Sequence, residues 1–252
     1  MKPRNILVAT MLLISIVSCK KDDSEPQSPF NGRTTAQFNP QKEYGTVTDI
    51  DGNEYKTIRI GEQEWMAENL RVTHYQNGEN LSQNDYTWYR EGDTIEQNTY
   101  SPNLVLQSTT NYTEADLEMI ATYGFSYTWD AATDNRNIAP EGWRVPTSAD
   151  WEKLINYLSD HNRDSIASYK LREKGNTHWQ IDNDSPFLNI SGFTANPWFP
   201  YAYGVSYWTT DTYESEYGSL LTTVCIQPGS ASKWHTNDYS WMIPIRCIKI
   251  KQ

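Results

Sequence analysis

The sequence predicts an α+β domain, with strands at both ends and helices between them. Strand-like runs occupy residues 46–50, 54–60, 205–210, 219–227 and 242–250. Helix signals occupy residues 113–124 and 147–158, the two main helices, and a short turn at 168–173. Because the helices separate the two groups of strands, the terminal strands are expected to pair in one sheet joined by long loops.

The first 18 residues have the form of a secretory signal, with Lys2 and Arg4 followed by an apolar run and a small residue before Cys19. This arrangement resembles the lipobox of bacterial lipoproteins, which implies that Cys19 carries a lipid after cleavage. Residues 19–42 are polar and contain proline, so they are expected to form a flexible tether. Residues 43–252 then form one domain.

Local signals place the first hairpin and both helices. Asp51 and Gly52 supply a tight turn between the first two strand-like runs. Each helix has a threonine cap with an aspartate three residues on. The second helix carries one apolar stripe, which consists of Trp151, Leu154, Ile155 and Leu158. Near the C-terminus, Pro244 favours an edge strand or a strand start, and residues 245–250 alternate as a strand does.

Charge excludes one class of partner. The chain carries a net charge of -11, and removing the signal with its two cations and no anions takes this to -13. Nucleic-acid binding needs a basic surface, so no nucleic-acid partner is expected. Anionic glycans are disfavoured for the same reason, unless a local basic patch or a metal ion intervenes.

The remaining cysteines and the histidines give no catalytic or metal-binding motif. Cys225 and Cys247 form an even pair in an exported chain, so a disulfide is expected, with two free thiols as the alternative. The four histidines show no zinc-binding spacing, and no metal site or catalytic residue is predicted. No cofactor is expected, although calcium held by loop carboxylates stays open; the segment 182–184 begins like a calcium loop but lacks its later ligands.

Aromatic residues are the strongest remaining signal, with 10 Trp and 17 Tyr in the chain. Rings with polar tips suit sugars and protein surfaces, because they offer an apolar face with little entropy to lose. Trp208 lies within a strand and is expected in the core. The candidate ligand-binding residues are Trp198, Tyr203, Trp234 and Tyr239.

Several motifs occur together in the order of a known family. They are "DIDGNEYKTIRIGEQEWMAENLRV", "YGFSYTWDAAT", "APEGWRVPTSADWEKL", "SGFTANP", "YWTT" and "IRCIKI". Over residues 44–250 the chain resembles the Fibrobacter succinogenes major paralogous domain family. The residues that carry this fold signature are Trp65, Asn69, Trp143, Arg144, Pro146, Thr147 and Trp151.

A more distant resemblance concerns "RVPTSADWE" and "IRCIKI", which are similar to segments of the formylglycine-generating, sulfatase-modifying enzymes. It implies a single domain of C-type-lectin-like fold. Those enzymes use a cysteine pair to bind copper, but Cys225 matches none of their catalytic motifs.

Together these features predict a lipid-anchored protein of the outer membrane, displayed at the cell surface. It is expected to be a non-catalytic binding or adhesion module for a glycan or a protein, held to the membrane by its lipid. The alternative is an oxidase or hydrolase of the formylglycine-generating-enzyme superfamily. In either case Trp143 and Arg144 are interpreted as a core anchor and its hydrogen-bonding neighbour, with the function placed in the loops between Asn176 and Ser240.

Overall fold

The computed structural model describes residues 28–88, 112–159, 164–179, 188–198 and 203–251. Its helices are α1 (Glu114–Tyr123), α2 (Trp129–Thr133), α3 (Ser148–Leu158) and α4 (Asp164–Leu171). Its strands are β1 (Gly45–Thr48), β2 (Glu54–Ile60), β3 (Gln63–Met66), β4 (Tyr86–Thr87), β5 (Ser126–Tyr127), β6 (Trp143–Arg144), β7 (Val205–Ser215), β8 (Gly218–Gln227), β9 (Ser230–Thr236), β10 (Ile243–Pro244) and β11 (Ile248–Lys249). The predicted α+β class is confirmed.

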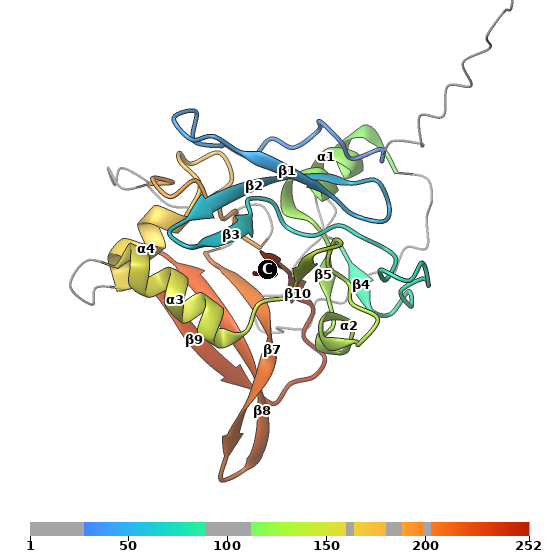
Figure 1. Cartoon of the computed structure of the whole chain (residues 1–252), viewed down its shortest axis with the longest axis vertical. Coiled ribbons are helices and arrows are strands. Elements are labelled where there is room, and N and C mark those ends of the chain that lie inside the picture. Colours follow the sequence, from blue (N-terminus) through green and yellow to red (C-terminus); the bar gives the residue numbers. More distant parts are fainter. Residues whose placement is uncertain (1–27, 89–111, 160–163, 180–187, 199–202, 252) are drawn as a thin grey trace, which may run out of the picture.

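The strands form three antiparallel sheets (Figure 1). The largest has the order β1-β2-β3-β11-β6, so β11 near the C-terminus lies between β3 and β6, two strands from much earlier in the chain. Ile248 is opposite Trp65 on one side and Arg144 on the other. The other sheets are β10-β5-β4 and β7-β8-β9, and the β7–β8 hairpin projects away from the large sheet. The expected pairing of terminal strands is therefore confirmed.

Two hydrophobic cores lie on either side of the large sheet. The neighbouring residues Trp65 and Met66 of β3 are both fully buried but belong to different cores, as alternation along a strand requires. The first core takes in the apolar faces of α1 and α2, and the second takes in α3, α4 and the inner face of β7-β8-β9. Cys247 and Ile248 divide between the cores in the same way.

Both main helices begin at the predicted threonines. The Thr113 side chain accepts from the backbone N–H of Asp116 in α1, and Thr147 accepts from Asp150 in α3, each as part of a complete capping box. The four stripe residues of α3 are all buried. Pro244 lies on β10, an edge strand, where its missing N–H costs nothing.

The segment 28–42 differs from the expected free tether. Phe30 is buried and its ring packs against Tyr112 and Phe125. Further along, the Thr35 hydroxyl lies 3.0 Å from Nε2 of the buried His178, and Asn39 donates to the carbonyl of Asn189. The segment is mostly polar, but it is held by its few aromatic rings and by hydrogen bonds. Residues 19–27 lie outside the described residues.

Gly124, which ends α1, is one position where glycine is required. Its φ is +73°, and a Cβ there would lie 2.7 Å from both Asn69 Cβ and the Leu70 carbonyl oxygen. We expect Gly124→Ala to lower the free energy of unfolding by about 2–3 kcal/mol. Gly142, with φ +78° and open space around it, is the matched control, for which Ala should cost about 1 kcal/mol. Urea denaturation measures both, and equal costs would contradict the steric explanation.

Candidate functional site

The family-signature segment around Trp143 and Arg144 is a structural joint. Trp143 is buried in the first core. The Arg144 guanidinium donates to both carboxylate oxygens of Asp150, at 2.7 and 3.0 Å. Asp150 also accepts from the backbone N–H and the hydroxyl of Thr147. The segment therefore ties β6 to the start of α3, as the sequence indicated.

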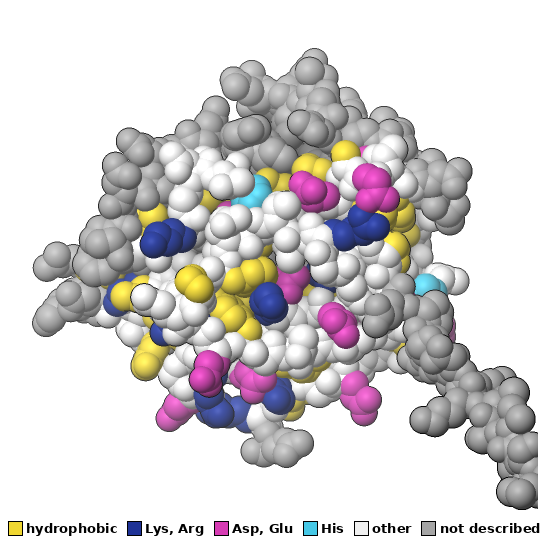
Figure 2. Space-filling view, turned by 90° about the horizontal axis from the view of Figure 1, so that it is seen from above, with side chains coloured by type: hydrophobic (Ala, Val, Ile, Leu, Met, Phe, Trp, Pro, Cys, Tyr) yellow, Lys and Arg dark blue, Asp and Glu magenta, His cyan; other side chains and the backbone are white. Residues whose placement is uncertain are grey.

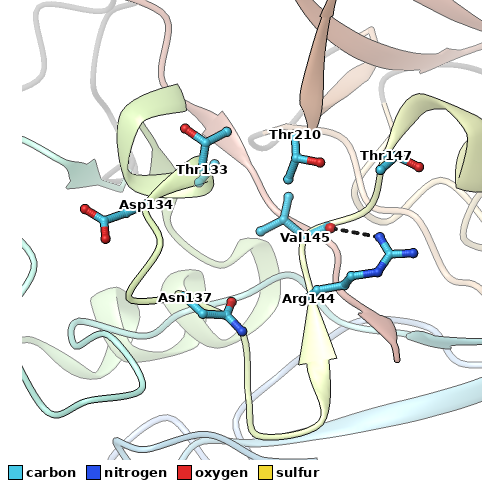
Figure 3. A pocket seen from close by; sticks show the side chains of 8 residues that line it. Thr133, Asp134, Asn137, Arg144, Val145, Thr147 and Thr210 are labelled. Carbon is cyan, nitrogen blue, oxygen red and sulfur yellow. Dashed lines mark hydrogen bonds between the residues drawn. The ribbon is translucent and has the colours of Figure 1, made fainter. Parts of the chain in front are cut away.

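A pocket of about 230 Å³ lies beside this joint (Figure 3). It is lined by Ala132, Thr133, Asp134, Asn137, Arg144, Val145, Thr147 and Thr210. Its charged groups are already used: Arg144 pairs with Asp150, and Asp134 pairs with Arg136 at 2.7 Å. Asn137 donates to the carbonyl of Trp143. Because these polar groups hold the fold together, the pocket is a poor candidate for ligand binding.

The Asp150 carboxyl makes the joint sensitive to acid. Burial raises its pKa, but the hydrogen bonds from Arg144 and Thr147 lower it more, so its pKa lies below the usual 3.8. A carboxyl whose folded-state pKa is lowered contributes stability above its unfolded pKa, and this contribution is lost as the pH falls through the folded value. We expect Asp150→Asn to be less stable than the wild type at about pH 7 and to approach it at about pH 2. Urea midpoints at both pH values measure this; a constant difference would contradict it.

The predicted ligand-binding aromatics separate into two groups. Tyr203, Trp234 and Tyr239 are 57%, 54% and 56% exposed. Trp198 is half-buried instead: it packs against both cores, and its indole N–H donates to the Ser126 hydroxyl at 2.9 Å. The neighbouring prolines suggested an exposed loop, but the Trp198 ring contacts both cores. Trp208 is fully buried, as expected.

Two more exposed aromatics lie on the β7–β8 hairpin, where the sequence analysis did not place a candidate. Tyr213 is 50% exposed and stacks on His235 of β9 with ring centroids 4.4 Å apart, and Tyr217 at the turn is 89% exposed. The turn sequence "YESEYG" carried the signal, since it sets aromatics among charges without a core pattern. In the loop after β9, Tyr239 meets Trp129 edge-on.

The opposite end of the molecule looks different. On the face seen in Figure 2, acidic and basic side chains are interspersed with small hydrophobic areas, and neither charge dominates. Scattered exposed apolar side chains of this kind are ordinary on a protein surface. The exposed aromatics around β7-β8-β9 are therefore the more distinctive feature.

The expected disulfide is absent from the structure, in which Cys225 and Cys247 are both free thiols. Cys247 lies fully buried in the first core. On β8, Val224 and Ile226 point into the second core, so Cys225 between them faces the other way. Burial raises the pKa of both thiols, with a hydrogen bond to Ser206 partly offsetting it at Cys225.

Thiol titration checks this arrangement. In the Cys19→Ala chain, we expect two thiols to react with Ellman's reagent after denaturation without any reductant, and Cys247 to stay unreactive in the folded protein because it is fully buried. A denatured chain that shows no reactive thiol would establish the disulfide instead.

The described residues contain no group of three or more histidine, cysteine or acidic side chains placed to hold a metal ion. His178 instead forms a buried pair with Glu173 at 2.8 Å. The calcium-like segment 182–184, like His161 and Cys19, lies outside the described residues. Within the same limits, no helix is long and apolar enough to span a membrane.

Comparison with known proteins identifies a family. A family model described as the Fibrobacter succinogenes major domain matches residues 58–249. That range contains both main helices, the joint at Arg144 and the sheet β7-β8-β9. No curated protein and no solved structure matches the chain.

Proposed function

The chain belongs to the Fibrobacter succinogenes major domain family, and from that premise we propose that it is an exported, lipid-anchored binding module of the cell surface. Its ligand is a glycan or a protein, and it performs no catalysis. The observation that carries the proposal is the share of the exposed rings that belongs to one part of the chain. Of the nine large hydrophobic side chains exposed among the described residues, five are aromatics of β7-β8-β9 and its flanking segments: Tyr203, Tyr213, Tyr217, Trp234 and Tyr239.

Exposed aromatic rings suit binding for a physical reason. Each ring offers a large, rigid contact area, so little conformational entropy is lost when a ligand covers it. At protein interfaces, tryptophan and tyrosine are enriched among the residues that contribute most to affinity. Rings in the core stabilise the fold, whereas these five keep half or more of their area in solvent.

The arrangement of the chain supports presentation of this surface. The described N-terminal segment runs beside α1, whereas the β7–β8 hairpin projects from the opposite end of the molecule (Figure 1). A lipid on Cys19 would attach the domain through that segment. The hairpin, with Tyr213 and Tyr217, would then point away from the membrane.

We further assign the domain to the C-type-lectin-like class. Two features support this: β11 from near the C-terminus pairs with β3 in the large sheet, and many of the described residues between those two strands belong to no helix or strand. The alternative, an oxidase of the formylglycine-generating superfamily, needs two accessible thiols. Cys247 is fully buried, which disfavours that reading.

Two experiments test the proposal. The Cys19→Ala chain is screened on a glycan array and in pull-downs from extracellular material, alongside assays for oxidase and hydrolase turnover. We expect a ligand and no turnover; turnover without any ligand would refute the binding function.

The second experiment is protease shaving of intact cells. Wild-type protein should be digested, and the Cys19→Ala variant should move to the soluble fraction. Protection of the wild-type protein would refute surface display.

A further inference from the structure

The two faces of the sheet β7-β8-β9 differ in chemistry. Residues directly opposite each other in antiparallel strands project on the same face, so the register sorts the side chains. The inner face belongs to the second core and consists of Val205, Tyr207, Val224, Ile226 and Ala231. The other face includes two adjacent cross-strand rows, Ser206–Cys225–Ser232 and Trp208–Thr223–Trp234. We call these six residues the Trp234 face.

The Trp234 face carries no charged side chain. The nearest charged side chain in the registered rows of the same face is Glu214 of β7, which lies opposite Ser219 toward the β7–β8 turn. The charge on β9 lies on the opposite face, where Lys233 pairs with Glu152 of α3. A ligand that docks on the accessible part of the Trp234 face would meet the hydroxyls of Ser206 and Ser232, the thiol of Cys225 and the indole of Trp234.

The Trp234 face is covered by other residues at β7 and exposed to solvent at β9. At β7 it is closed, because Trp208 is fully buried and its indole donates to the Tyr127 carbonyl at 2.7 Å. At β9 it is open, since Trp234 is 54% exposed and Ser232 is half-buried. The Trp234 indole N–H donates to the Ser232 hydroxyl at 3.2 Å, which orients the ring along the strand.

A buried hydroxyl lies between the two tryptophans. Thr223 is 1% exposed, and its hydroxyl has no hydrogen-bond partner among the described residues. A buried hydroxyl without a partner is costly, on the order of 1–3 kcal/mol. Because this oxygen is enclosed, its cost belongs to the fold, and a ligand on the surface does not contact it.

We propose that the Trp234 face binds a neutral polysaccharide. One pyranose ring would stack its C–H face on the Trp234 indole, while the Ser206 and Ser232 hydroxyls exchange hydrogen bonds with the sugar hydroxyls. Hydroxyl groups are both donors and acceptors, which matches a ligand made of hydroxyls better than a charged peptide or an anionic glycan. This inference rests on the proposed function and specifies its ligand class.

Affinity electrophoresis tests the inference. The Cys19→Ala chain runs in native gels that contain hydroxyethylcellulose, xylan or galactomannan, with anionic polygalacturonate as the contrast. We expect retardation by at least one neutral polymer and none by polygalacturonate. Because no ionic contact is involved, raising NaCl from about 0.05 to 0.5 M should leave the retardation unchanged.

Two matched variants locate the site. Trp234→Ala should weaken the affinity at least tenfold, whereas Tyr157→Ala, which removes a 64% exposed ring from α3, should bind like the wild type. Circular dichroism verifies that both variants fold. Retardation by no neutral polymer, or equal retardation of both variants, would overturn the inference. If a protein is captured instead, and its capture needs the exposed aromatics, the binding module stands and the polysaccharide assignment falls.

Discussion

Replacing Arg246 by methionine is expected to lower the free energy of unfolding by about 3–5 kcal/mol. Arg246 is fully buried and links segments that are distant in sequence. Its guanidinium donates twice to the Asn69 side chain, at 2.9 and 2.7 Å, and to the carbonyl of Phe193 at 2.7 Å. Methionine preserves much of the volume but leaves these buried acceptors without donors, and each costs on the order of 1–3 kcal/mol.

Urea denaturation measures this loss, and Lys249→Met is the matched control. The Lys249 side chain is 50% exposed and pairs with Glu64 at 3.1 Å on the surface. Exposed pairs of this kind contribute about 0–1 kcal/mol. A loss of less than about 1 kcal/mol for Arg246→Met would contradict the role assigned to Arg246.

Trp151→Ala is the second change with a large expected effect, also about 3–5 kcal/mol. The Trp151 ring is fully buried and stacks on Tyr207 with ring centroids 5.3 Å apart, and the Trp65 ring centroid lies 4.7 Å from it. Truncation would leave a cavity at the centre of the second core, between α3 and the sheet that carries the proposed ligand surface.

Tyr157→Ala on the same helix is the control, because Tyr157 is 64% exposed and should cost no more than about 0.5 kcal/mol. Thermal or urea unfolding compares the two. If both variants lost the same stability, burial of the apolar stripe would not be what holds α3 against the second core.

The sequence predicted α1 and α3 well because the residues that define each helix lie close together in the chain. Each threonine cap and the aspartate three residues later exchange hydrogen bonds within one helical turn. In α3, an apolar stripe of period 3.6 also marks the buried face. The same holds for the β1–β2 hairpin, whose Gly52 adopts φ +75° at the turn.

Features that depend on distant contacts were not predictable in this way. Alternation over residues 245–250 suggested one buried face, yet Ile245, Arg246, Cys247 and Ile248 are all buried, because the chain there runs between the two cores. Of the seven residues of strand β9 only Ala231 is buried, so no apolar alternation marks the strand in the sequence. It is a strand because it pairs with β8. Likewise, the average polarity of 28–42 hid the anchoring role of Phe30.

For the candidate site, sequence alone separated Tyr203, Trp234 and Tyr239, which were expected in loops, from the core tryptophan Trp208, which was expected in a strand. Trp234 lies within strand β9 and not in a loop, and it is exposed on this edge strand of its sheet. Trp198 was likewise expected in a loop and is nonetheless half-buried. Which face of β9 each side chain occupies depends on its register with β8, which no local pattern reveals.

The most direct test of the central claim, that exposed aromatics around β7-β8-β9 bind the ligand, compares three Cys19→Ala chains on the ligand that the screens identify. The first chain has no further change. The second carries Tyr203→Ala, Trp234→Ala and Tyr239→Ala. The third replaces by alanine three exposed residues elsewhere: Ile50, Tyr157 and Ile190.

The dissociation constant is measured for each chain by titration. We predict that the first and third chains bind equally and that the second binds at least tenfold more weakly, a difference of about 1.4 kcal/mol or more. Equal dissociation constants for all three chains would contradict the proposed binding surface.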